Sequence, residues 1–97
     1  MAGKRITILA IDDDPSDIEL LREYLEAIPD WDVELLAYTD PGPARAELGR
    51  GEVDVIISDY MLGAETGLEM LRKIREAGDA TPVIVLTGRA TKRWPSK

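Results

Sequence analysis

The stretch Val53-Asp54-Val55-Ile56-Ile57-Ser58-Asp59 decides the fold of this chain. Its aliphatic and β-branched residues lie between Gly51 and Gly63 and are typical of a strand that is buried on both faces of a parallel sheet. Asp59 stands at the carboxyl end of this strand. In an open parallel sheet, the strand ends on that side border a shared crevice where ligands bind. The stretch therefore predicts a carboxylate at the rim of a binding crevice.

Two further apolar strands are expected to end at the same rim. Ile6-Thr7-Ile8-Leu9-Ala10-Ile11 runs into Asp12-Asp13-Asp14, and Pro82-Val83-Ile84-Val85-Leu86 runs into Thr87. A single aspartate after a strand often only caps a helix or turns a loop. Two apolar strands that both end on aspartate favour a different interpretation, in which the carboxylates form one acidic pocket.

The size and composition of the chain indicate one globular domain. Its 97 residues are 44% hydrophobic and 32% charged, which is typical of a folded chain and not of a disordered one. No apolar run approaches the roughly 20 residues that a bilayer crossing needs. Met1-Ala2-Gly3-Lys4-Arg5 leads directly into the first strand, so we expect no signal peptide, no membrane anchor and a cytoplasmic location.

The residue types that are absent restrict the chemistry. The chain has no cysteine and no histidine, which excludes disulfides, thiolate catalysis and histidine general bases. The net charge is −7, but residues 89–97 hold four basic residues and no acid, which leaves residues 1–88 at −11. A body this acidic repels nucleic acid. We therefore expect no direct binding to nucleic acid.

Strands and helices are predicted to alternate along the chain. The helices are predicted from the hydrophobic spacing and from capping residues: Asp14-Pro15 opens the first, Pro41 and Pro43 delay the second, and Gly78 ends the third. The expected strands are 5–11, 33–39, 53–59 and 82–86, and the expected helices are 15–28, 44–48 and 67–77. This alternation favours a parallel α/β sheet with right-handed crossovers over residues 1–88, followed by a basic tail over residues 89–97.

Asp12, Asp13 and Asp59 suggest a particular chemistry for the predicted pocket. Carboxylates this close together are unfavourable unless they are protonated or neutralised by a cation. Oxygen ligands of this kind suit Mg²⁺, which takes one or two carboxylates together with phosphate oxygens. A carboxylate nucleophile beside such an ion is equipped for phosphoryl transfer onto aspartate.

Over residues 4–88 the chain resembles the receiver domain of bacterial two-component response regulators. The resemblance rests on four motifs in this order: Ile11-Asp12-Asp13-Asp14-Pro15, Asp54-Val55-Ile56-Ile57-Ser58-Asp59-Tyr60-Met61-Leu62, Thr66-Gly67-Leu68-Glu69 and Pro82-Val83-Ile84-Val85-Leu86-Thr87-Gly88. It implies a flavodoxin-like (CheY-like) parallel sheet, truncated to four strands in the order 2-1-3-4 with three helices.

The resemblance also implies roles for individual residues. Asp59 would accept a phosphoryl group from a histidine kinase or a phosphotransfer protein, Thr87 would be the hydroxyl that reports its presence, and the Gly88 amide would lie near the phosphate oxygens. Mg²⁺ would be bound by Asp13 directly, by Asp12 chiefly through water, by Asp59, and by the backbone carbonyl of Met61.

The chain departs from this family at its end. It stops ten residues after Thr87, where the family continues with a fourth helix, a fifth strand that ends in Lys-Pro, and a fifth helix. The strand over residues 82–86 would then be an aliphatic sheet edge, which invites pairing with another chain. We expect a homodimer formed through this edge and the uncovered apolar face, with Trp94 either an anchor against a neighbour or part of a loosely ordered terminus.

We therefore expect a phosphoacceptor module and not an enzyme, and two alternative functions remain open. The first is a non-switching pseudo-receiver, or truncated scaffold, that dimerises through the exposed edge. The second is a phosphatase, because Asp12-Asp13-Asp14 and Val85-Leu86-Thr87-Gly88 also resemble the first two motifs of haloacid-dehalogenase-type enzymes. There Asp12 would be the nucleophile and Asp14 the general acid.

Overall fold

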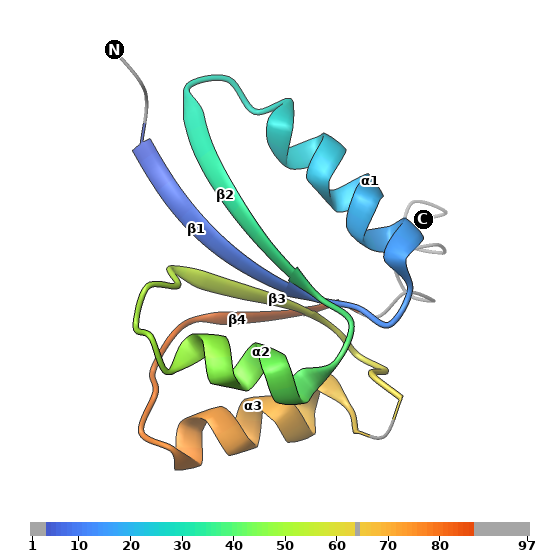
Figure 1. The fold of residues 1–97 in the computed structure, drawn as a ribbon, viewed down its shortest axis with the longest axis vertical. Coiled ribbons are helices and arrows are strands. Elements are labelled where there is room, and N and C mark those ends of the chain that lie inside the picture. The colour runs from blue at the N-terminus through green and yellow to red at the C-terminus, as the bar shows by residue number, and fades with distance from the viewer. Residues whose placement is uncertain (1–3, 64, 87–97) are drawn as a thin grey trace, which may run out of the picture.

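Four strands and three helices alternate along the part of the chain that the structure describes, as the sequence predicts. The computed structural model describes residues 4–63 and 65–86, and Figure 1 shows the arrangement of the elements. Their bounds are β1 (Lys4–Ile11), α1 (Pro15–Glu26), β2 (Trp31–Tyr38), α2 (Pro41–Leu48), β3 (Val55–Asp59), α3 (Gly67–Glu76) and β4 (Val83–Leu86).

The strands form one parallel sheet in the order β2-β1-β3-β4. This confirms the expected strand order and places β1 and β3 side by side at its centre. In the register of these two strands, Ile11 lies opposite Ser58. The residues that follow each of them, Asp12 and Asp59, are therefore delivered to the same end of the sheet.

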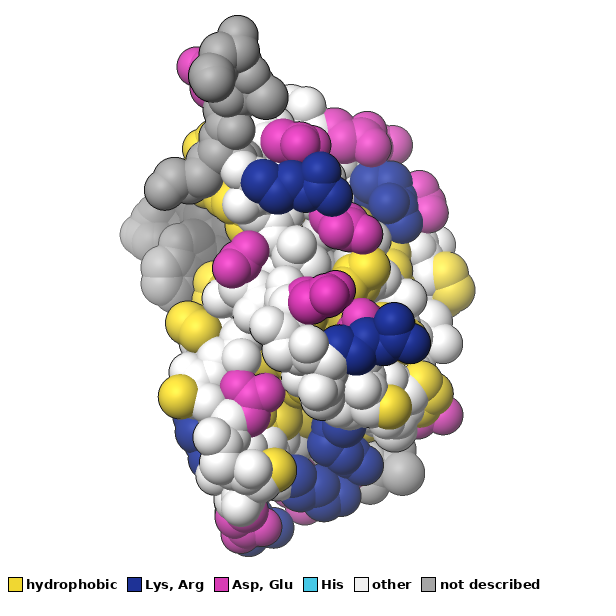
Figure 2. Space-filling view, turned by 60° about the vertical axis from the view of Figure 1, so that its left-hand side comes forward, with side chains coloured by type: hydrophobic (Ala, Val, Ile, Leu, Met, Phe, Trp, Pro, Cys, Tyr) yellow, Lys and Arg dark blue, Asp and Glu magenta, His cyan; other side chains and the backbone are white. Residues whose placement is uncertain are grey.

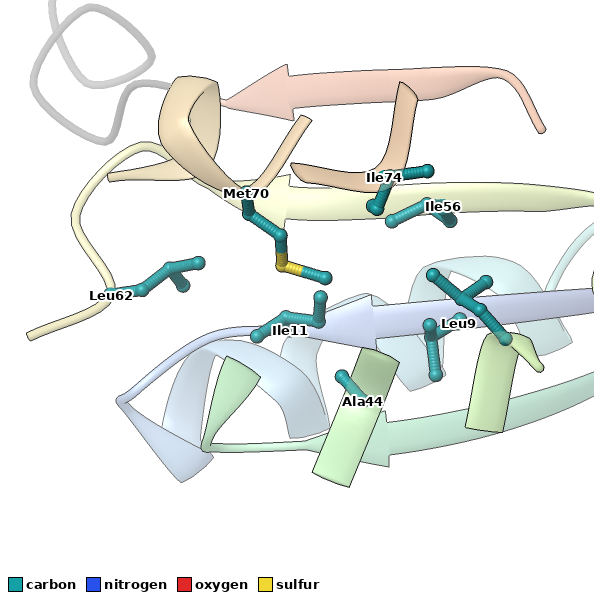
Figure 3. Close-up of a cluster of buried hydrophobic side chains, with 8 residues drawn as sticks. Leu9, Ile11, Ala44, Ile56, Leu62, Met70 and Ile74 are labelled. Carbon is teal, nitrogen blue, oxygen red and sulfur yellow. The ribbon is translucent and has the colours of Figure 1, made fainter. Parts of the chain in front are cut away.

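The helices cover the sheet from both sides, with α1 on one face and α2 and α3 on the other (Figure 1). Because side chains alternate along a strand, Leu9 and Ile11 face α2 and α3, whereas Ile8 and Ala10 face the opposite side. Figure 3 shows side chains from β1, β3, α2, α3 and the loop after β3 meeting in the larger core. This core consists of Leu9, Ile11, Ala44, Leu48, Ile56, Leu62, Met70 and Ile74. Full burial of each large aliphatic side chain contributes about 1.5 to 3 kcal/mol.

The second helix begins earlier than predicted. It starts at Pro41 and not near Ala44, because Asp40 caps it by accepting a hydrogen bond from the Gly42 N–H at 3.1 Å. Proline is tolerated in the first helical turn, where backbone N–H groups have no partner within the helix. Pro41 and Pro43 therefore belong to the helix instead of delaying it.

The central strand is shorter than the stretch that predicted it. It begins at Val55, because Asp54 makes a different contact with β1: its carboxylate accepts a hydrogen bond from the Thr7 N–H at 2.8 Å, and its own N–H donates to the Thr7 carbonyl at 2.9 Å. Asp54 thus joins β3 to β1 one residue ahead of the strand.

The sequence predicted that β3 is buried on both faces, but only one of its faces is fully buried. Ile56 and Ser58, which point toward α2 and α3, are buried, whereas Val55 and Ile57 on the other face are partly exposed. Beside them on β4, Ile84 is 50% exposed and Leu86 is 43% exposed. Among the described strands, β4 is the edge next to β3, as expected, and its outer face is apolar.

The surface shown in Figure 2 carries acidic and basic side chains that are interspersed, with hydrophobic side chains in small groups between them. Within residues 4–63 and 65–86, no helix has the length and hydrophobicity to cross a bilayer. The predicted tail over residues 89–97, including Trp94, lies outside the described residues.

Candidate functional site

Carboxylates from the ends of β1 and β3 meet at one rim of the sheet. Asp12, Asp13 and Asp59 each offer a carboxylate oxygen, and these oxygens all lie within 4.8 Å of one another. Asp12 and Asp59 are partly buried, whereas Asp13 is exposed. The structure therefore brings together three acidic residues that the sequence placed in one pocket, although Asp12 and Asp59 are 47 positions apart in the sequence.

Backbone contacts hold the first of these carboxylates in place. The Asp12 N–H donates to the Tyr38 carbonyl at 3.1 Å, which continues the pairing of β1 with β2 by one residue. The Asp14 N–H donates to the Asp12 carboxylate at 2.9 Å. Asp14 in turn accepts a hydrogen bond from the Ser16 N–H at 2.9 Å and caps α1, as predicted. The three aspartates after β1 thus have different roles, since two approach the cluster and the third starts the helix.

Burial and mutual repulsion disfavour the ionised form of the carboxyl groups in this cluster. Burial raises the pKa of Asp12 to about 6, and the nearby charges of Asp59, Asp17 and Asp13 act in the same direction. Burial also raises the pKa of Asp59, again assisted by the charges of Asp13 and Asp17, while the nearby backbone N–H groups of Tyr60 and Met61 oppose the shift. A bound cation would relieve this repulsion.

The loop after Asp59 turns back on itself beside the cluster. The Tyr60 N–H donates to the Leu86 carbonyl at 2.7 Å, and the Gly67 N–H donates to the Tyr60 carbonyl at 2.6 Å, so the end of β3, the end of β4 and the start of α3 are joined. Met61 pairs with Thr66 across this loop. Met61 lies two residues after Asp59, and the role of its carbonyl as a ligand remains a prediction.

Helix α3 approaches β3 closely at Gly67. A Cβ atom added there would lie 2.7 Å from the Asp59 carbonyl oxygen and 3.1 Å from the Ser58 hydroxyl oxygen. Ser58 is buried, and its hydroxyl donates to the same Asp59 carbonyl at 2.9 Å. Only glycine permits this contact without a shift of the backbone, so Gly67 sets how near α3 lies to the acidic cluster.

Several contributors to the site were missed from the sequence. Asp17, in the first turn of α1, adds its charge to the cluster. Thr66 and Glu69 form a capping box at the start of α3, with hydrogen bonds of 2.9 and 3.1 Å. The spacing Thr-x-x-Glu before an apolar run is a known signal for this motif. Thr87 and Gly88 follow β4 but lie outside the described residues, so their roles remain predictions.

The residues present fit a magnesium ion. All three converging donors are carboxylate oxygens, which are hard ligands, and the chain contains no cysteine or histidine that would favour a softer metal. Repulsion within the cluster provides the electrostatic reason for a cation to bind there. Asp12, Asp13 and Asp59 would hold it, and the acidic cluster is thus a candidate Mg²⁺ site.

The fold and the site together define a class of protein: a flavodoxin-like parallel α/β domain with an acidic cluster at the carboxyl ends of its central strands. Comparison with known families is consistent with this class, since the family model of the response regulator receiver domain matches residues 8–95. The chain belongs to the response regulator receiver domain family.

Known relatives match most of the chain in sequence or in structure. The transcriptional regulatory protein TrcR of Mycobacterium tuberculosis is 37% identical over 87 residues, which cover 90% of this chain and 33% of TrcR. The chemotaxis response regulator CheY4 of Vibrio cholerae superposes with a TM-score of 0.65 at 29% identity, covering 88% of this chain and 68% of CheY4. The response regulator MaeR, bound to beryllium trifluoride, gives a TM-score of 0.75 at 26% identity, covering 84% of this chain and 66% of MaeR. The chain spans about a third of the length of TrcR.

Proposed function

We propose that this chain is a phosphoacceptor of two-component signal transduction, and that Asp59 receives the phosphoryl group from a histidine kinase or a phosphotransfer protein. The convergence of Asp12, Asp13 and Asp59 within 4.8 Å carries this proposal. It is supported by membership of the receiver family and by the similarity to MaeR, whose structure contains beryllium trifluoride. The backbone carbonyl of Met61 would be the remaining protein ligand of Mg²⁺.

The proposed reaction uses Asp59 as the nucleophile. One of its carboxylate oxygens bonds to phosphorus while the bond from phosphorus to the donor's imidazole nitrogen breaks, and that nitrogen takes up a proton from water. When bound, Mg²⁺ supplies positive charge that neutralises the phosphoryl oxygens and the carboxylates. Asp12 and Asp13 would hold the ion, and the hydrogen bond from the Tyr60 N–H to the Leu86 carbonyl fixes the end of β3 from which Asp59 projects.

Phosphorylation would act as a switch and not as a step in catalytic turnover. We propose that Thr87 follows the phosphoryl group and that the Gly88 amide contacts its oxygens, as the family resemblance implies. The modified site then favours one of two surface conformations, and a partner reads the difference. The cytoplasmic location and the absence of direct nucleic acid binding, both expected from the sequence, belong to this proposal.

Incubation with acetyl phosphate and Mg²⁺, followed by intact mass spectrometry, tests the proposal. We expect one added phosphoryl group on the wild-type chain and none on Asp59→Asn. The control is Asp32→Asn, which removes the same charge from an exposed ion pair with Arg5 and should still be labelled. Label that persists in Asp59→Asn contradicts the proposal. Turnover of a generic phosphate ester that is lost in Asp12→Asn but kept in Asp59→Asn would favour the phosphatase alternative.

The exposed edge supports a second candidate function, assembly with another copy of the chain. Ile84 lies beside Ile57, on the sheet face opposite to that of the buried Ile56, and Ile84 and Leu86 are 50% and 43% exposed. Pairing of β4 edges would join the two sheets through backbone hydrogen bonds, and packing of the same face against the second copy would bury Ile84 and Leu86. The pseudo-receiver alternative would use this contact alone. Light scattering at micromolar concentration should show a dimer that Ile84→Asp disrupts. A wild-type chain that is a stable monomer contradicts this assembly.

A further inference from the structure

An ionic network joins both helices of one sheet face to the loop that follows Asp59. Glu65 lies in this loop, and its two carboxylate oxygens have separate partners. Arg45 of α2 donates to one oxygen at 2.8 Å, and Lys73 of α3 donates to the other at 2.8 Å. The Glu65 side chain is only 13% exposed. Two cations from different helices therefore hold one largely buried carboxylate.

The charge of Glu65 is maintained by these partners. Burial raises the pKa of its carboxyl, but the hydrogen bond from Lys73 and the charge of Arg45 outweigh burial, and the pKa is lowered overall. Exposed ion pairs contribute little to stability because solvent screens them and their side chains lose entropy. A carboxylate with both oxygens paired and little exposure is held more firmly, so its position is well defined.

The backbone around Glu65 transmits this position to the metal-site loop. The Glu65 carbonyl accepts a hydrogen bond from the Leu62 N–H at 3.0 Å, and the next residue, Thr66, pairs with Met61. The loop closes where the Gly67 N–H donates to the Tyr60 carbonyl, next to Asp59. A shift of Glu65 would therefore displace Met61, the predicted carbonyl ligand.

We propose that Glu65 is a positioning residue: its ion pairs with Arg45 and Lys73 hold the loop after Asp59 so that Met61 lies where the acidic cluster binds Mg²⁺. This inference deepens the proposed function and rests on it. The network does not touch the ion. It fixes the segment that carries a ligand, as outer-shell partners of metal ligands do, and loss of such partners typically weakens metal binding about 10- to 100-fold.

Positioning and simple electrostatics predict opposite effects for one substitution. Arg45→Gln removes a positive charge, so electrostatics alone would strengthen Mg²⁺ binding. Positioning predicts weaker binding, because the loop loses one of its two anchors. Glu65→Gln removes a negative charge, and both effects weaken binding there. Arg45→Gln therefore separates the two explanations, and Arg45→Lys, which keeps the charge, should restore most of the affinity.

Isothermal titration calorimetry with Mg²⁺ on the full 97-residue chain tests the inference. We expect binding to weaken about tenfold in Glu65→Gln and about threefold in Arg45→Gln. The control Glu76→Gln makes the same change in net charge as Glu65→Gln at the end of α3, and its affinity should stay within about twofold of wild type, on the scale of a screened surface charge. Circular dichroism in EDTA identifies any variant that does not fold. If one of Glu65→Gln and Arg45→Gln is unfolded, the Mg²⁺ affinity of the other is compared with that of wild type.

Two outcomes are decisive. The inference is overturned if Arg45→Gln binds Mg²⁺ as tightly as wild type or more tightly. It is also overturned if Glu65→Gln has the same Mg²⁺ affinity as the Glu76→Gln control. Both results presuppose that the wild-type chain binds Mg²⁺. A wild-type chain without Mg²⁺ binding would instead overturn the proposed function, so the two failures are distinguishable.

Discussion

Substitution of Gly67 by alanine tests whether the close approach of α3 to the acidic rim matters. The new Cβ atom would lie 2.7 Å from the Asp59 carbonyl oxygen, 3.1 Å from the Ser58 hydroxyl oxygen and 3.3 Å from a methyl group of Val85. Carbon and carbonyl oxygen normally stay roughly 3.3 Å or more apart, so the start of α3 must move by about 0.5 Å. Such overpacking costs about 1 to 3 kcal/mol, while alanine regains at most about 1 kcal/mol of helix propensity.

The expected net loss is about 1 to 2 kcal/mol, which lowers the melting temperature of a domain of this size by about 5 to 15 °C. Thermal unfolding followed by circular dichroism measures it. Gly42→Ala is the matched control, because it makes the same change in the first turn of α2, where the nearest atom is an Asp40 carboxylate oxygen at 3.8 Å. Its Cβ has room, and its expected cost is the restriction that Pro43 places on a preceding helical residue, so it should lose less stability than Gly67→Ala. A Gly67→Ala chain that melts with or above wild type refutes the reasoning.

Two further predictions concern the rim of the sheet. Burial raises the pKa of Asp12 to about 6, above its unfolded value of about 3.9. In metal-free buffer, the folded state thus keeps a proton on Asp12 between about pH 4 and 6, whereas the unfolded state loses it. The free energy of unfolding should therefore fall as pH rises through this window, by up to about 1 kcal/mol after solvent screening. Asp12→Asn should flatten this dependence in urea denaturation, and an unchanged slope would contradict the cause assigned to the shift. Thr66→Ala removes the capping hydrogen bond of α3 and should cost about 1 kcal/mol in the same assay, whereas Thr66→Ser should restore most of it; equal stability of both variants would show that the cap contributes nothing.

The sequence was sufficient to predict the sheet and the convergence of its carboxylates. Apolar runs that end on Asp12 and Asp59 need only the geometry of parallel strands to bring those residues together, and the structure places them at one rim. The strands and their convergence depend on backbone periodicity, which is visible in the order of residues along a single strand. The position of β4 at the sheet edge was predicted instead from the strand order of the receiver family that the chain resembles.

Features that depend on side chains from separate elements could not be predicted in this way. Arg45 and Glu65 are 20 residues apart, and nothing in their local spacing shows that α2 carries one of them to the other. The close contact of Gly67 with Asp59 depends on how α3 packs. The error at Pro41 had another source, because proline was treated as a helix breaker where the first turn accepts it.

Paramagnetic broadening by Mn²⁺ tests the shared metal site most directly, since Mn²⁺ accepts the same oxygen ligands as Mg²⁺. In two-dimensional NMR spectra of the chain, substoichiometric Mn²⁺ should first broaden the amide signals of Asp12, Asp13 and Asp59. The signals of Arg5 and Asp32, at the far end of the sheet, should stay sharp. In Asp59→Asn the broadening should no longer be selective for the signals at the rim. Excess Mg²⁺ should restore the broadened signals. Broadening that begins elsewhere, or that is unaffected by Asp59→Asn, would contradict a single ion shared by the ends of β1 and β3.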